Sequence, residues 1–212
     1  MTSPQEISVE DLAARIVDRG RTQRSLTAVC GPPGAGKSTL ADELAAQLNA
    51  QDPGSAAVFP MDGYHFDDLI LNARGWRPRK GAPHTFDVGG FRHMLLRLRQ
   101  NDEDEIAVPV FDRSIEIARN SARVIPRSVR HLIVEGNYLL LNEAPWRDLA
   151  PLFDTTVFLN VPLAELERRL AERWQDLSET DRKAKLEEND LPNARQVVSG
   201  SLPAEFQIVF NP

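Results

Sequence analysis

The chain has 212 residues, of which 42% are hydrophobic and 26% charged, and its formal net charge at pH 7 is −6. This length and composition predict one globular domain, residues 1–212, with a core of its own. An acidic balance differs from the basic face of general nucleic-acid binders, so we expect no nucleic-acid partner. The one cysteine, Cys30, allows no internal disulfide and favours a reducing compartment. Neither a signal-peptide pattern nor a long apolar run occurs, which predicts a cytoplasmic protein without a membrane span.

The first part of the chain alternates helix and strand patterns. In order, the predicted elements are a helix over 8–19 with Ser8 as N-cap, a buried strand over 25–30, a helix from Lys37 and a second strand over 56–61. A glycine-rich turn follows the first strand, and Asp62-Gly63 closes the second. This order is typical of a βαβ unit.

Residues 64–86 depart from this alternation. They contain a short helix pattern over 67–72 and then the basic, proline- and glycine-rich run 75–83. A connection of this length inside an α/β unit is usually functional or mobile. A helix over 88–100 follows, and the apolar runs 106–111 and 123–125 predict an antiparallel ribbon.

The last part of the chain returns to strands and helices. Its predicted elements are strands over 131–136, 155–161 and 206–210, a short helix from Pro145, a longer helix from Pro162 to Leu177, a charged stretch over 178–190 and a short helix near Asn193. Strands that alternate with helices in this way predict the α/β class, with a mainly parallel, doubly wound sheet flanked by helices.

The turn after the first strand matches the phosphate-loop pattern G-x-x-x-x-G-K-S. The residues expected to hold phosphates are Gly31, Pro32, Pro33, Gly34, Ala35, Gly36, Lys37 and Ser38, with Thr39 in support. Inward backbone N–H groups and a helix N-terminus favour phosphate there, Lys37 would bridge the β- and γ-phosphates, and Ser38 would ligate Mg²⁺. A turn that only caps a helix is the alternative. The position between a strand and an amphipathic helix favours phosphate binding, and the predicted cofactors are ATP and Mg²⁺.

Two other classes of nucleotide-binding protein fit the sequence poorly. GTPases read guanine with Asn-Lys-x-Asp, and this tetrapeptide is absent from the sequence. A D-x-x-G match begins at Asp87, but it follows a proline-rich loop rather than a buried strand, so we interpret it as a coincidence. Motor and transporter ATPases usually have larger domains. A compact chain with a charged, lid-like segment is typical of a small-molecule kinase.

Five motifs carry a family resemblance by their order. They are Gly31–Thr39, Pro60–His65 (PMDGYH), Lys80–Asp87 (KGAPHTFD), Pro109–Asp112 (PVFD) and Val134–Leu140 (VEGNYLL). Together they resemble the P-loop kinases of the phosphoribulokinase, uridine kinase and pantothenate kinase family, in particular bacterial proteins described as nucleoside/nucleotide kinase-like or as fructose transport system kinases. The resemblance covers roughly residues 25–200. It implies a P-loop NTPase fold with a substrate-side segment at about 62–90 and a mobile lid at about 168–190.

The resemblance also assigns roles to two carboxylates. Asp62 matches the acidic residue at the end of the family's second strand, which implies a general base that accepts the proton of the substrate hydroxyl. An Asp-Gly turn without chemistry is the alternative. Glu135 matches the second acidic position, which implies a role on Mg²⁺, directly or through water, rather than a merely solvated strand end. Which of the two carboxylates touches the metal stays open.

Basic and aromatic residues are candidates for contacts with the two substrates. Arg169 and Arg173 share one helical face, and lid arginines in related kinases contact the transferring phosphate. Ion pairs with neighbouring glutamates explain both arginines equally well, and Arg173 is preferred because it lies nearer the charged stretch. The residues expected around the acceptor are Tyr64, His65, Lys80, His84 and Arg113.

The resulting prediction is an ATP-dependent kinase that transfers the γ-phosphate to a hydroxyl of a sugar or sugar-like substrate. A nucleoside or pantothenate-type acceptor is the second choice, since the segment 80–87 departs from the uridine kinase pattern and is closer to that of pantothenate kinases. A nucleotide-binding regulatory module and an ATPase that moves a protein partner are rivals from other classes. The expected partner is a small-molecule substrate, and a homodimer is compatible with the sequence.

Overall fold

The computed structural model of the chain describes residues 3–210. Six strands form one parallel sheet in the order β1-β8-β7-β2-β6-β3. Their bounds are Gln5–Glu6 (β1), Ser25–Cys30 (β2), Ala56–Pro60 (β3), His131–Gly136 (β6), Thr155–Asn160 (β7) and Phe206–Val209 (β8). The predicted α/β class with a mainly parallel sheet is confirmed, and among the strands of this sheet the two-residue β1 had no predicted counterpart.

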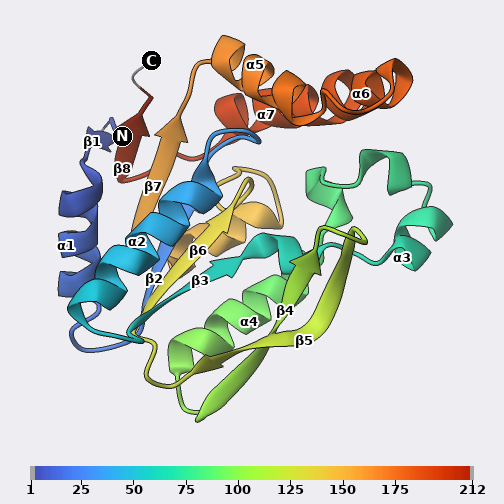
Figure 1. The fold of residues 1–212 in the computed structure, drawn as a ribbon. Helices are drawn as coiled ribbons and strands as arrows, with labels where there is room; N and C mark the ends of the chain where they lie inside the picture. The colour runs from blue at the N-terminus through green and yellow to red at the C-terminus, as the bar shows by residue number, and fades with distance from the viewer. Residues whose placement is uncertain (1–2, 211–212) are drawn as a thin grey trace.

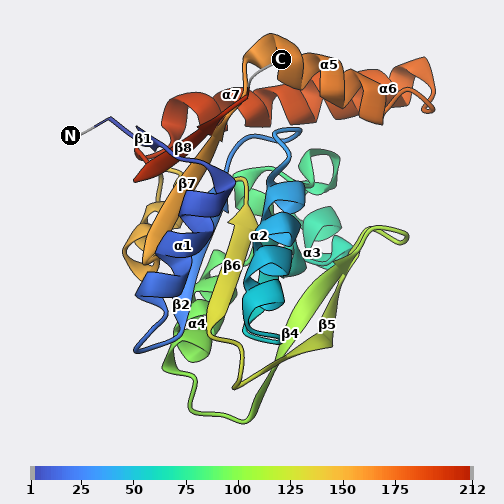
Figure 2. The same cartoon turned by 60° about the vertical axis from the view of Figure 1, so that its left-hand side comes forward.

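Helices cover both faces of this sheet (Figures 1 and 2). The longer ones are α1 (Val9–Arg19), α2 (Lys37–Gln51), α4 (Val88–Gln100), α5 (Leu163–Arg173) and α7 (Leu191–Gly200), and the shorter ones are α3 (Asp68–Ala73) and α6 (Glu179–Lys185). One buried apolar cluster joins α1 and α2 to the sheet, and a second joins α4 and the 3₁₀ helix Trp146–Leu152 to the opposite face. Strand residues alternate between the two clusters because successive side chains point to opposite faces.

Helix α1 begins as its sequence predicts. The side-chain oxygen of Ser8 accepts a hydrogen bond of 3.0 Å from the backbone N–H of Asp11, which satisfies one of the free donors at the start of the helix. Asp87 plays the same part for α4, where its side chain accepts from the N–H of Gly90. The D-x-x-G match at Asp87 is therefore a helix cap in this chain.

An antiparallel ribbon stands apart from the main sheet. It consists of β4 (Glu105–Asp112) and β5 (Ile117–Pro126), so the predicted ribbon is confirmed, with a longer second strand than expected. The ribbon packs against the 3₁₀ turn Met61–Tyr64, where a Cβ on Gly63 would lie only 2.7 Å from the backbone oxygen of Pro109. Glycine at this position lets the ribbon approach the end of β3 closely.

Three helical segments cross the carboxyl ends of the strands, at the top of Figure 1. They are α5, α6 with a π-helical turn over Leu186–Asp190, and α7. The helix predicted to run to Leu177 ends at Arg173, and the charged stretch 178–190, which had no predicted element, is helical. Among residues 3–210, no helix combines the length and the apolar character needed to cross a bilayer.

Candidate active site

The phosphate loop connects the centre of the sheet to α2. Strand β2 lies between β6 and β7, and α2 begins at Lys37 directly after the loop. Gly34 and Gly36 have φ values of 82° and 95°, a region that residues with a Cβ rarely adopt. A Cβ on Gly36 would meet nothing within 4 Å, so its conformation rather than crowding favours glycine there. The loop thus has the backbone that a phosphate cradle requires.

Lys37 is almost fully buried beneath this loop. Its side chain is 8% exposed, and Nζ donates a hydrogen bond of 3.0 Å to the backbone oxygen of Pro32. Burial lowers the pKa of Lys37, while the negative charges of Glu135 and Asp62 oppose that shift. The ammonium group is therefore held inside the loop beside two carboxylates.

The two carboxylates come from the ends of neighbouring strands. Glu135 is the last but one residue of β6, in register with Val29 of β2 and Pro60 of β3, and Asp62 follows two residues after Pro60. Glu135 is 6% exposed, and burial raises its pKa, an effect that the positive charge of Lys37 opposes. Because parallel strands end at the same edge, the sheet brings both acids to the phosphate loop.

Asp62 has a cation from the ribbon as its partner. Arg113, which follows β4, donates from Nη2 to Oδ2 of Asp62 at 3.1 Å, and its own side chain is 74% exposed. His65 lies on the other side, with Nδ1 2.8 Å from the backbone oxygen of Asp62. Since that oxygen can only accept, Nδ1 carries the proton in this arrangement. Burial lowers the pKa of His65, which favours the neutral ring.

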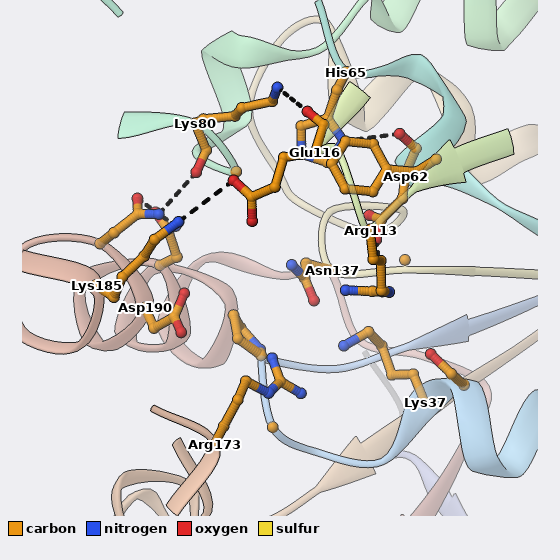
Figure 3. A pocket seen from close by; sticks show the side chains of 18 of the residues that line it. Lys37, Asp62, His65, Lys80, Arg113, Glu116, Asn137, Arg173, Lys185 and Asp190 are labelled. Atoms are coloured by element: carbon orange, nitrogen blue, oxygen red, sulfur yellow. Dashed lines mark hydrogen bonds and ion pairs between the residues drawn. The ribbon is translucent and has the colours of Figure 1, made fainter. Parts of the chain in front are cut away.

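One cavity unites most of the predicted site residues (Figure 3). In Figure 3 the side chains of Lys37, Arg113 and Arg173 point toward a common space. The predicted residues that line it are Pro33, Gly34, Lys37, Ser38, Asp62, His65, Lys80, Arg113, Glu135 and Arg173. These residues come from the phosphate loop, two strand ends, the segment after α3, the ribbon and the lid.

Two predicted acceptor residues lie elsewhere. The ring of Tyr64 packs in the core, 5.0 Å from that of Phe91, and its buried hydroxyl has no hydrogen-bond partner among the described residues. His84 is exposed and packs edge-on against Trp76 at 5.0 Å. Neither lines the cavity, because the 3₁₀ turns that hold them direct Tyr64 toward α4 and His84 toward solvent. The structure therefore offers no support for their predicted role as acceptor contacts.

Lys80 lines the cavity but is already engaged. Its ammonium lies 2.6 Å from Oδ1 of Asp68, also donates to the backbone oxygen of Glu116, and sits 5.6 Å from the ring centre of Phe111. These contacts join the segment after α3 to the tip of the ribbon. Because of these contacts, Lys80 contributes to the structure of the cavity wall.

The two candidate arginines on α5 have different surroundings. Arg169 pairs with Glu165 at 2.7 Å, donates to the backbone oxygen of Gly34 at 3.3 Å and lies 4.4 Å from the ring centre of Phe210. It supports the outer side of the phosphate loop. Arg173 lines the cavity, and no ion pair or hydrogen bond engages its guanidinium within residues 3–210.

Eleven cavity residues were not predicted, and four of them come from the lid. The eleven are Gly81, Phe86, Phe111, Glu116, Gly136, Asn137, Trp174, Lys185, Asn189, Asp190 and Asn193. Asn137 follows Glu135 by two residues and could have been found from that spacing. Lys185, Asn189 and Asp190 lie in the charged stretch 178–190, where no apolar periodicity indicates the direction in which a side chain points.

The lid is bonded directly to the segment after α3. Asn189, on the π-helical turn, donates from Nδ2 to the backbone oxygen of Lys80 at 2.8 Å. Arg79 donates to the side-chain oxygens of Asn189 at 3.3 Å and Asn193 at 3.2 Å. Lys185 adds an ion pair of 3.6 Å to Glu116 on the ribbon. In this arrangement the lid closes one side of the cavity.

The residues at the phosphate loop fit MgATP by their chemistry. The glycines with positive φ allow successive N–H groups to face a phosphate, and the ammonium of Lys37 lies at the start of α2. The hydroxyl of Ser38 and the carboxylate of Glu135 line the same cavity, and both are oxygen ligands of the kind that Mg²⁺ prefers. Ser38 and Glu135 would hold the ion, and Lys37 would contact the phosphates.

Comparison with known proteins agrees with this geometry. The family model described as an AAA domain matches residues 28–190. The "Uncharacterized protein YggC" of Escherichia coli K12 is 36% identical over 87% of this chain and 77% of its own length, and the "Putative uridine kinase C227.14" of Schizosaccharomyces pombe is 34% identical over 81% and 75%. A crystal structure of a "putative fructose transport system kinase" from Silicibacter sp. TM1040 is 41% identical, with a TM-score of 0.87 over 95% of this chain and 98% of that one. The chain therefore belongs to the P-loop kinases related to uridine kinase and pantothenate kinase, phosphotransferases with hydroxyl acceptors.

Proposed function

We propose that this protein transfers the γ-phosphate of ATP to a hydroxyl of a sugar or sugar-like molecule held beside Asp62. The observation that carries the proposal is that Lys37, Asp62 and Glu135 line one cavity at the ends of neighbouring strands. A phosphate-binding ammonium and a carboxylate that can receive a proton are the two groups that this transfer requires at one place.

Asp62 is proposed to accept the hydroxyl proton as the acceptor oxygen attacks phosphorus. Its position supports this role, since it lies in the cavity with Arg113 bound to one oxygen at 3.1 Å. Lys37 and Arg173 would offset the charge that spreads over the transferring phosphoryl group. Mg²⁺, held by Ser38 and Glu135 when bound, supplies further charge neutralisation at the phosphates.

A sugar-like acceptor fits the rest of the cavity wall. The aromatic rings of Phe86, Phe111 and Trp174 line it together with the amides of Asn137 and Asn193. Apolar faces with a few placed polar groups are usual where a polar ring is bound. The description of the Silicibacter structure as a putative fructose transport system kinase supports the same acceptor class, whereas the description of the S. pombe relative as a putative uridine kinase supports a nucleoside as the second candidate.

The test is ADP release from MgATP with D-fructose, D-ribose, glycerol, uridine and pantothenate, each with wild-type protein and Asp62→Asn. We expect one acceptor class to stimulate turnover and Asp62→Asn to lower that turnover at least about 100-fold, since general-base catalysis commonly contributes that much. Asp67→Asn is the matched control, because Asp67 caps α3 outside the cavity and asparagine also caps helices well. Equal turnover in wild type and Asp62→Asn would contradict the role of Asp62, and turnover without any acceptor would contradict the kinase reaction.

A further inference from the structure

Three described cations on the acceptor side of the cavity are already paired with carboxylates. The pairs are Lys80 with Asp68 at 2.6 Å, Lys185 with Glu116 at 3.6 Å and Arg113 with Asp62 at 3.1 Å. Within residues 3–210, the cavity cations without a carboxylate partner are Lys37, beneath the phosphate loop, and Arg173, on the lid. With Arg173 engaged by the transferring phosphate, as proposed above, an anionic acceptor would have to break an existing pair in order to be neutralised.

Asp190 adds a carboxylate to this side of the cavity. It ends the π-helical turn of the lid, is only partly exposed and lines the cavity. The indole Nε1–H of Trp174 donates to its Oδ2 at 2.8 Å, which fixes the orientation of the carboxylate. Within the described residues no donor is bonded to its Oδ1, so one oxygen remains available to a ligand.

Two carboxylates thus face the acceptor space from different walls. Figure 3 shows Asp190 on the lid side and Asp62 on the side of the ribbon, with Asn137 between them. Carboxylates accept hydrogen bonds from hydroxyl groups and repel phosphate and carboxylate groups. A molecule with hydroxyls at both ends can donate hydrogen bonds to both carboxylates. A molecule with a hydroxyl at one end and an anionic group at the other cannot.

We propose that Asp190 is a specificity-determining residue that binds a second hydroxyl of a neutral polyhydroxylated acceptor and excludes acceptors that are already phosphorylated or carry a carboxylate at that end. This inference rests on the proposed function and names the acceptor class more narrowly. A hydrogen bond between a hydroxyl and a charged acceptor corresponds to a factor of about 10 to 100 in affinity. Loss of that bond is therefore expected to raise mainly the KM for the acceptor.

The test compares Asp190→Asn with wild type on three matched pairs of acceptors. These are D-fructose and fructose 6-phosphate, D-ribose and ribose 5-phosphate, and glycerol and glycerol 3-phosphate. We expect the KM of the neutral acceptor to rise about 10- to 100-fold, the KM of MgATP to change less than about twofold, and the preference for neutral over phosphorylated acceptor to fall. Asparagine can still accept from the Trp174 indole, so the lid contact is retained.

Glu187→Gln is the matched control, because Glu187 lies on the same π-helical turn but is exposed and outside the cavity. An unchanged acceptor preference in Asp190→Asn overturns the proposal. An equal rise in the KM for MgATP and the KM for the acceptor also overturns it, because it would mean that Asp190 has only a structural role. If wild type phosphorylates none of the acceptors, the proposed function fails separately. Calorimetry of the same six compounds with MgADP then decides: neutral compounds that bind wild type at least about tenfold tighter than Asp190→Asn support the inference, and equal or absent binding overturns it.

Discussion

Replacement of Arg24 by methionine should lower the free energy of unfolding by about 2–6 kcal/mol. Arg24 precedes β2, is 3% exposed and has no carboxylate partner among residues 3–210. Its guanidinium instead donates to the backbone oxygens of Val129 at 2.7 Å, Leu98 at 2.9 Å and Pro126 at 2.8 Å. Burial lowers the pKa of Arg24 to about 10, so the group stays charged at neutral pH.

The expected magnitude follows from two of these carbonyls. Methionine keeps most of the apolar stem but leaves the oxygens of Val129 and Leu98 without a donor, and each buried unpaired group costs about 1–3 kcal/mol. The oxygen of Pro126 adds little, because it also accepts a hydrogen bond of 3.1 Å from the backbone N–H of Val129. Urea unfolding followed by tryptophan fluorescence measures the change.

Arg21→Met is the control, since Arg21 is 74% exposed and its ion pair with Asp18 should contribute less than about 1 kcal/mol. A loss below about 1.5 kcal/mol for Arg24→Met would refute the reasoning, because it would mean that water replaces the guanidinium at these carbonyls without cost.

Two further predictions concern the turn at Asp62 and the buried histidine of β6. Gly63→Ala should lower kcat at least about tenfold. The new Cβ would be too close to the oxygen of Pro109, so the turn that carries Asp62 must move, and small misplacements at a reacting centre are costly. Steady-state kinetics check this, and an unchanged kcat in a folded variant would contradict it. The free energy of unfolding should fall as pH drops below about 6.5, because burial lowers the folded-state pKa of His131 and the unfolded state then binds the proton more readily. Urea unfolding at pH 5 to 8 measures the contribution of His131 to the free energy of unfolding, which is fully present above pH 6.5. An equally steep pH dependence in His131→Gln would assign the effect to other groups, such as His65.

The parts of the site that could be predicted from sequence are those set by local spacing. The phosphate loop is continuous in the chain, and Asp62 and Glu135 each follow an apolar run that ends at the same edge of a parallel sheet. The core helices and strands were predictable for the same reason: their apolar residues recur at regular spacings within continuous stretches of the chain.

The acceptor side could not be predicted in this way because distant segments build it. Tyr64 and His65 are neighbours after Asp62, and only the packing of the 3₁₀ turn against α4 decides that Tyr64 enters the core while His65 lines the cavity. Asp190 lies in a polar stretch without apolar periodicity, and its direction depends on the indole of Trp174. Side chains of this kind acquire a role only through tertiary contacts.

The bonds between the lid and the segment after α3 have a consequence for timing. Asn189 binds the backbone of Lys80, and Arg79 binds both Asn189 and Asn193, so the two sides of the cavity separate only when these bonds break together. A phosphorylated product enclosed between them leaves no faster than that opening. The lifetime of the closed lid would then set an upper limit on the turnover number, even where phosphoryl transfer itself is fast.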